Sequence, residues 1–229
     1  AHLKGQSKVW QIEHRLKKAN GEWTWVLGRG QVVKRDAQGN PLRMIGTMSD
    51  IQMKKENEEI IWRQANYDAL TDLPNRKFVT ELLDQEIRKA KREKNQVWLM
   101  FLDLDGFKAV NDELGHQRGD ELLQSVTSRL KDSVRDSDVV GRLGGDEFII
   151  MFTELNDIEK LDYFAARIIN NIAEPYQLGD HQARVTASIG IANYPKDSKN
   201  REDLMKFADQ AMYQAKNSGK NRFVYFDQQ

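Results

Sequence analysis

The chain has 229 residues, of which 39% are hydrophobic, and this is enough for one ordinary domain and a smaller second piece. Lysine plus arginine equal aspartate plus glutamate at 35 each, so no net charge favours nucleic acid or an anionic membrane as a partner. The lack of cysteine excludes disulfides and thiolate metal sites, and no apolar run approaches the ~20 residues of a membrane-spanning helix.

Three strand-like stretches, 8–16, 22–33 and 41–47, open the chain and are separated by turn residues. They predict an antiparallel meander with its tryptophans on one face. Through Asn-Gly-Glu-Trp-Thr-Trp (20–25) and Gly-Thr-Met-Ser-Asp-Ile (46–51), the region resembles the C-terminal half of a PAS sensor domain. We expect Trp23 and Trp25 to pack in a core or a pocket floor. We expect no sensory ligand, since the half that walls most of such a pocket is missing.

The next stretch, 51–66, is rich in lysine, glutamate and glutamine and predicts a helix that Ser49 and Asp50 can cap. Apolar residues recur every seven positions from Met53, as in a coiled coil. The other positions that would face a partner helix are polar. Two interpretations stay open for this linker: a short parallel coiled coil, or a single solvated helix.

The rest of the chain alternates helical and strand-like patterns. A continuous apolar run at 97–102 is typical of a strand buried on both faces. Helices are expected at 76–92, 107–114, 121–134, 158–173 and 201–217, a turn at 115–120, and further strands at 137–143, 148–152, 176–178, 183–192 and 222–226. This order predicts an α/β (α+β) sandwich with a central, mostly antiparallel sheet and flanking helices.

Gly144 and Gly145 join two apolar runs and predict a β-hairpin whose turn needs positive φ. Asp146 and Glu147 follow the turn directly. Backbone without side chains lets a large anionic ligand approach, and adjacent carboxylates suit a hard divalent cation. Taken alone, a hairpin with a solvated acidic tip explains this stretch equally well.

A second pair of acids, Asp103 and Asp105, ends the buried strand at 97–102. Acids at the end of a buried strand are costly unless they are paired, hydrogen-bonded or bound to metal. This second acidic strand end favours a functional site over a solvated tip.

The motifs Gly-Gly-Asp-Glu-Phe (144–148), Phe-Leu-Asp-Leu-Asp-Gly-Phe-Lys (101–108) and Tyr-Asp-Ala-Leu-Thr-Asp-Leu-Pro-Asn-Arg (67–76) resemble the GGDEF family of diguanylate cyclases. The resemblance implies a fold related to nucleotide cyclases and polymerase palm domains. It also implies condensation of two GTP molecules into cyclic di-GMP and two pyrophosphates across a homodimer. The expected domains are a partial PAS domain (1–50), a linker helix (51–67) and a cyclase domain (68–229).

The resemblance places the metal ligands at the two acidic strand ends, at Asp103, Asp146 and the Leu104 carbonyl. Glu147 is implied as a further metal contact or as the base that helps to ionise the attacking hydroxyl. Two divalent ions, Mg²⁺ or Mn²⁺, are implied per site, because ions held by carboxylates neutralise phosphate charge in an in-line displacement. Asp105 is expected to brace the loop instead of binding metal.

The GTP contacts implied by the family are spread along the chain. The expected triphosphate contacts are N–H groups at a helix start, three lysines and the hairpin glycines, and the expected guanine readers are one asparagine and one aspartate. In order, these residues are Gly106, Phe107, Lys108, Asn111, Asp120, Gly144, Gly145, Lys216 and Lys220. A solvated cationic face would also account for the last two lysines.

Arg135 and Asp138 form an Arg-x-x-Asp pattern just before the hairpin strand. In the family, this spacing marks a product-inhibition site for cyclic di-GMP, and arginine can both stack on guanine and form paired hydrogen bonds. Arg167 on the following helix is an expected further contact. An ion pair at a helix end is the alternative interpretation.

Another class of function stays open, namely a catalytically silent module that senses GTP or cyclic di-GMP. The intact Gly-Gly-Asp-Glu-Phe motif favours the enzyme. We expect a cytoplasmic location, either alone or as the cytosolic part of a larger, membrane-attached protein, since the chain begins Ala-His-Leu without methionine. Neither nucleic acid nor a membrane segment is expected.

Overall fold

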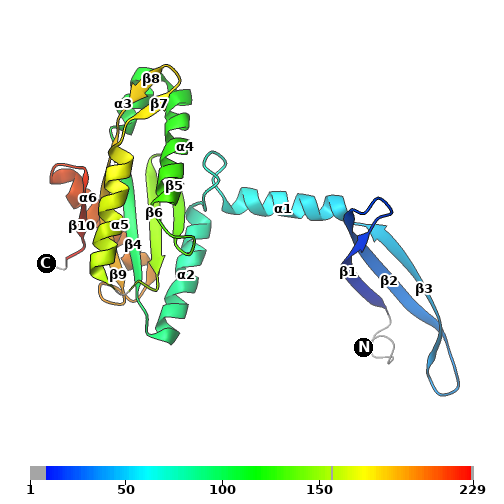
Figure 1. The fold of residues 1–229 in the computed structure, drawn as a ribbon. Helices are drawn as coiled ribbons and strands as arrows, with labels where there is room; N and C mark the ends of the chain where they lie inside the picture. Colours follow the sequence, from blue (N-terminus) through cyan, green and yellow to red (C-terminus); the bar gives the residue numbers. More distant parts are fainter. Residues whose placement is uncertain (1–8, 156, 228–229) are drawn as a thin grey trace. The chain divides into compact units, whose positions relative to one another are not determined.

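The computed structural model describes residues 9–155 and 157–227 (Figure 1). The chain forms two compact units, Ala1–Ala65 and Asn66–Gln229, and each is described by itself. Expectations for residues 1–8, including the start of the first predicted strand, lie outside the described residues. Every helix in the described part of the chain falls short of the length and apolarity needed to cross a membrane.

The first unit is a three-stranded antiparallel sheet followed by a helix. The sheet order is β1-β2-β3, and the elements are β1 (Trp10–Lys17), β2 (Trp23–Arg35), β3 (Pro41–Asp50) and α1 (Gln52–Asn66). Gly21 and Gly39 take φ of 89° and 84° in the two connecting turns, a conformation that glycine adopts without strain. The predicted meander, consistent with part of a PAS fold, is therefore confirmed.

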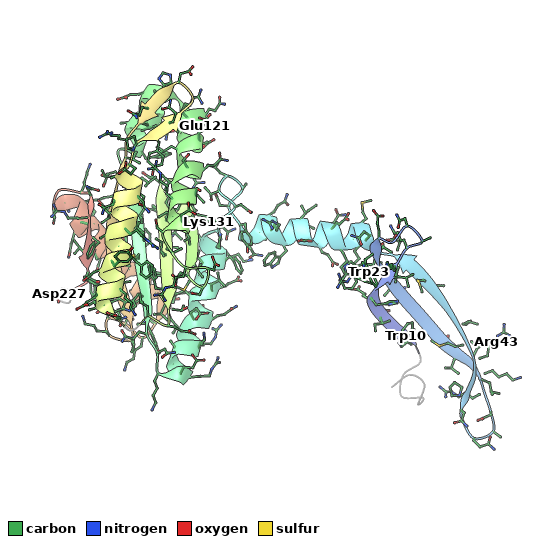
Figure 2. All side chains as sticks on the ribbon, in the orientation of Figure 1. Trp10, Trp23, Arg43, Glu121, Lys131 and Asp227 are labelled. Atoms are coloured by element: carbon green, nitrogen blue, oxygen red, sulfur yellow. The ribbon has the colours of Figure 1, made fainter. Side chains whose placement is uncertain are left out.

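The tryptophans of this sheet do not share one face, so that expectation is wrong. Thr24 and Val26 take the buried face of β2, and alternation along a strand then places Trp23 on the opposite face, where it is 61% exposed. Trp10 lies against Gly28, on the face of Val26. Figure 2 labels Trp10 on β1 and Trp23 at the start of β2. The prediction that Trp23 packs in a core is also wrong.

The second unit is built on a five-stranded sheet of order β10-β9-β4-β6-β5. The central strand β4 is antiparallel to both of its neighbours, and only the edge strand β10 pairs in parallel, with β9. The strands are β4 (Val97–Asp105), β5 (Val139–Gly144), β6 (Glu147–Thr153), β9 (Thr186–Tyr194) and β10 (Arg222–Tyr225). The predicted, mostly antiparallel sheet is confirmed.

Helices cover both faces of this sheet (Figure 1). Because side chains alternate along a strand, Met100 and Leu102 of β4 enter different cores from Leu99 and Phe101. The first core is shared with α3 (Phe107–Leu114), α4 (His116–Asp132) and α5 (Ile158–Ala173), and the second with α2 (Arg76–Glu93) and α6 (Arg201–Asn217). Asp103 lies an even number of residues after Leu99 on β4, so its side chain is on the same face of the sheet, the face covered by α2 and α6.

Two predicted boundaries are wrong. Residues 116–120 are the first turn of α4, not a loop, because Gly115, at φ 85°, both ends α3 and precedes α4. The predicted strand at 183–192 is two strands: β8 (His181–Ala183) pairs with β7 (Tyr176–Leu178), and β9 begins at Thr186.

Candidate active site

The two acidic strand ends meet at one end of the sheet. In the β4–β6 ladder Asp103 lies directly opposite Glu147, and the Leu104 N–H donates to the Asp146 carbonyl at 3.3 Å. Asp103 is therefore brought beside Asp146 and Glu147, which lie more than 40 positions later in the sequence. The sheet register alone produces this convergence.

The hairpin turn between β5 and β6 is open and firmly held. Gly144 and Gly145 have φ of 137° and 54°, and a Cβ built on either would meet nothing within 4 Å. Glycine is therefore required here by conformation, and the backbone is left accessible to a ligand. Arg142 holds the turn, since its Nε and Nη2 donate to the Gly145 carbonyl at 3.0 and 2.7 Å.

The segment before α2 and the first residue of that helix anchor the hairpin. Arg142 Nη1 donates to Asp68 at 2.8 Å, and Arg76 Nε donates to the Leu143 carbonyl at 3.2 Å. Burial pushes the pKa of Asp68 up, but hydrogen bonds from Thr71 and Arg142 hold it below its ordinary value. Sequence reasoning did not predict the contact between Arg142 and Asp68; its only signal was a charged Arg142 inside an apolar run.

Two of the three carboxylates are engaged by cations. Asp103 Oδ2 lies 2.7 Å from Lys216 Nζ, and Glu147 Oε2 lies 3.3 Å from Arg76 Nη2. Burial raises the pKa of Asp146, and the charge of Asp103 raises it further. Burial also raises the pKa of Glu147, against the opposing effect of Arg76. The site therefore holds an excess of negative charge that a cation would relieve.

The donor set fits a hard divalent ion, because it consists of carboxylate and carbonyl oxygens. Among residues 9–155 and 157–227, however, no three His, Cys, Asp or Glu side chains gather as a metal site. The contacts above account for this, since Asp103 points to Lys216 and Glu147 to Arg76. Metal ligation at Asp103, Leu104, Asp146 and Glu147 stays a prediction.

The predicted phosphate-binding residues lie around the same end of β4. Gly106, at φ 89°, immediately precedes α3. The first N–H group that donates a hydrogen bond within this helix is that of Ala109, so the N–H groups of Phe107 and Lys108 are not used by the helix itself. Lys216 lies in the last turn of α6. Lys220 follows that helix in a left-handed turn at φ 60°.

Asp105 ties this turn to the sheet. Its carboxylate accepts from the hydroxyls of Thr186 and Ser188, both at 2.8 Å, and from the Asn221 N–H at 3.3 Å. Asp105 is only 8% exposed. A buried carboxylate with three donors is satisfied without metal, which agrees with the bracing function expected for it.

The predicted guanine readers lie on neighbouring helices. Asn111 belongs to α3, and its carboxamide packs directly against Gly119 of α4, where a Cβ would collide with it. Asp120 is the next residue along α4. Gly119 thus leaves room for the Asn111 side chain, which the sequence did not reveal because its partner lies on another helix.

The Arg-x-x-Asp pattern lies at the opposite end of β5 from the hairpin turn. The Arg135 N–H donates to Asp138 Oδ2 at 3.0 Å, and both residues line a cavity of about 520 Å³ together with Tyr67 and Phe78. Burial raises the pKa of Asp138. The two residues are therefore close, and the hydrogen bond between them is made by the backbone N–H of Arg135 and not by its guanidinium.

Arg167 meets Arg135 at an aromatic ring. Both guanidinium carbons lie 5.1 Å from the centre of the Phe164 ring, and Arg167 also donates to the Ser133 carbonyl at 2.6 Å. The first and third predicted residues of this site thus share contact with one aromatic ring.

Comparison with known proteins identifies the family of the chain. Residues 65–222 match the model of the family described as "Diguanylate cyclase, GGDEF domain", and residues 1–48 match the PAS fold. The chain belongs to the GGDEF family.

Its relatives include bifunctional enzymes and isolated domains. The chain is 43% identical over 175 residues, 76% of its length, to the bifunctional diguanylate cyclase/cyclic di-GMP phosphodiesterase MucR of Pseudomonas aeruginosa, of which it covers 25%. The structure of the GGDEF domain of TpbB (YfiN) from the same species is 36% identical, with a TM-score of 0.69, covering 71% of this chain and 95% of that one. The coiled coil and GGDEF domain of Caulobacter crescentus DgcB, solved with c-di-GMP, is 28% identical, with a TM-score of 0.70, covering 76% and 93%. The chain spans 21% to 38% of the length of the curated relatives it matches.

Proposed function

We propose that this chain is a diguanylate cyclase that condenses two GTP molecules into cyclic di-GMP and two pyrophosphates. The observation that carries the proposal is the convergence of Asp103, Asp146 and Glu147 at the end of the central strand, beside Lys216. Each 3′-hydroxyl attacks the α-phosphate of the other nucleotide and expels pyrophosphate. The reaction needs charge neutralisation at phosphate and a proton acceptor near the hydroxyl.

Asp103, Asp146 and the Leu104 carbonyl would hold two divalent ions, Mg²⁺ or Mn²⁺. When bound, such ions neutralise triphosphate charge and make the hydroxyl more acidic. Glu147 either contacts an ion or accepts the hydroxyl proton. Its pKa is raised by burial, which brings the carboxylate closer to the proton affinity of an effective base at neutral pH.

The remaining residues bind and select GTP. The first N–H groups of α3, at Phe107 and Lys108, favour an anion, and Lys216 and Lys220 supply cations from a second side. Gly106, Gly144 and Gly145 keep the backbone open. Asn111 and Asp120 would hydrogen-bond the guanine edge, and adenine would leave such groups unpaired.

A homodimer completes the reaction, because one site holds one GTP and the product contains two. In this proposal residues 1–50 are part of a PAS domain, 51–67 link it to the enzyme, and 68–229 are the cyclase domain. The enzyme acts in the cytoplasm, where its GTP is found. Cyclic di-GMP would bind back at Arg135, Asp138 and Arg167 and lower the rate.

The test is incubation of the purified chain with GTP and Mg²⁺, with and without added cyclic di-GMP. Cyclic di-GMP should form, and added product should slow its formation. Asp146→Ala should abolish turnover while the circular dichroism spectrum is retained, whereas Asp132→Ala, an exposed acid at the end of α4, should leave turnover unchanged. GTP binding without any product would instead support a silent sensing module.

A further inference from the structure

Lys216 holds an unusual position for a lysine proposed to bind phosphate. Its Nζ lies 2.7 Å from Asp103 Oδ2, and the two side chains are only 30% and 12% exposed. An ion pair withdrawn from solvent is less screened than a surface pair and is held more firmly. The carboxylate that it pairs with is the one proposed to bind a divalent ion.

The second cationic contact at the site is looser. Arg76 reaches Glu147 at 3.3 Å, and its side chain is 59% exposed. Such an exposed pair is easily exchanged with water. Of these two contacts, the Lys216–Asp103 pair is therefore the one that a bound metal must disrupt at a cost.

A metal ion bound by Asp103 would compete with the Lys216 ammonium for the same carboxylate. Mg²⁺ binds carboxylate oxygen at about 2.0–2.1 Å, so an ammonium at 2.7 Å from that atom would be strongly repelled. The ammonium stands on a flexible four-carbon stem fixed at α6, so it can turn away to another anion. A triphosphate beside the metal provides that anion.

We propose that Lys216 is an exchanging cation, which neutralises Asp103 until metal and nucleotide bind together and then transfers to the triphosphate. This rests on the proposed function of the site. Lys216 opposes metal alone and favours metal with nucleotide, so the two ligands bind with positive coupling. The ammonium thereby makes the site select the metal–nucleotide complex over the free ion.

The test is Mn²⁺ binding measured by electron paramagnetic resonance without nucleotide, and GTP binding measured in EDTA. Lys216→Gln should bind Mn²⁺ at least about fivefold more tightly than the wild type, the lower end of ordinary coupling, and should bind GTP more weakly. A residue that only supports the fold would weaken both. The matched control is Lys220→Gln, which removes the same charge from the turn after α6 and should weaken GTP binding while changing Mn²⁺ affinity less than twofold.

If the Lys216→Gln variant binds Mn²⁺ no more tightly than the wild type, the proposed exchange of Lys216 is overturned. If that variant does not fold, the proposal can be tested on the wild type by NMR. Saturating Mg²⁺ without nucleotide should shift the Lys216 ¹³Cε resonance, and an unchanged resonance would overturn the proposal. If the wild type makes cyclic di-GMP but these tests fail, only the proposed exchange is refuted. If the wild type binds neither Mn²⁺ nor GTP, the proposed function is refuted as well.

Discussion

At the residue scale, the ionised carboxylate of Asp146, just before β6, is destabilised by its surroundings. Burial raises the pKa of Asp146, the charge of Asp103 raises it further, and Lys216 partly offsets both. Burial and the Asp103 charge both oppose the ionised form that a metal would need. The pKa of Asp146 therefore reports on how close Asp103 is to it.

Asp103→Asn should lower the pKa of Asp146. The substitution removes a neighbouring negative charge and frees Lys216 to stabilise the remaining carboxylate, and both changes favour ionisation. The measurement is a ¹³C NMR titration of the Asp146 carboxyl group without added metal. Asp132→Asn should leave the pKa where it is, and an unchanged pKa in Asp103→Asn would show that the two acids do not interact.

Gly119→Ala should weaken GTP binding. Its methyl group would displace the Asn111 carboxamide, so we expect the KM for GTP to rise about tenfold and the preference for GTP over ATP to fall. Alanine is the better helix former at this position, so helix propensity would not explain the effect. Ser128→Ala, on the exposed side of α4, is the control, and equal KM values in both variants would remove Gly119 from the site.

At the scale of elements, the β5–β6 hairpin is positioned by the segment that precedes α2 and by the first residue of that helix. Arg142 joins the Gly145 carbonyl to Asp68, and its side chain is only 10% exposed. Arg76 adds a second bond to the Leu143 carbonyl. The turn proposed to lie beside the substrate is thus held by residues that are not part of the hairpin, Asp68 and Arg76.

Asp68→Asn should lower the free energy of unfolding by about 1–2 kcal/mol at pH 7, because it leaves a largely buried guanidinium without its charged partner. Since the pKa of Asp68 is lowered by folding, its contribution is present above the ordinary value of about 3.9 and is lost as the pH falls through the folded value. Urea unfolding at several pH values measures this. The gap between wild type and variant should narrow in acid, and a gap independent of pH would contradict the assignment.

Periodicity and turn chemistry predicted much of this arrangement. The apolar run of β4 and the glycines at 144 and 145 located both acidic strand ends, because each signal is local. The start of α4 was misplaced since a single residue, Gly115, separates two helices. The Lys216–Asp103 pair could not be predicted, because only the packing of α6 on β4 brings such distant positions together.

At the scale of the whole molecule, the two units differ sharply in how much core they contain. Both hydrophobic clusters lie between Leu73 and Met212, wholly within the second unit. Among residues 9–65, the buried hydrophobic side chains are Val26 and Ile51, while Trp23 and Met53 are 61% and 72% exposed. A unit with so little buried apolar surface contributes little folding energy of its own.

A fragment of residues 66–229 should therefore fold cooperatively and bind GTP with Mg²⁺ as tightly as the full chain, since both cores and every proposed site residue lie within it. Its unfolding temperature should lie within about 3 °C of the main transition of the full chain. Its rate of cyclic di-GMP synthesis should fall more steeply on dilution, because the proposed pairing of two sites loses the linker. Calorimetry, nucleotide binding and a dilution series of the rate measure these three quantities. The fragment 1–65 alone should show no cooperative transition, and a sharp transition there would mean that the first unit has a core of its own.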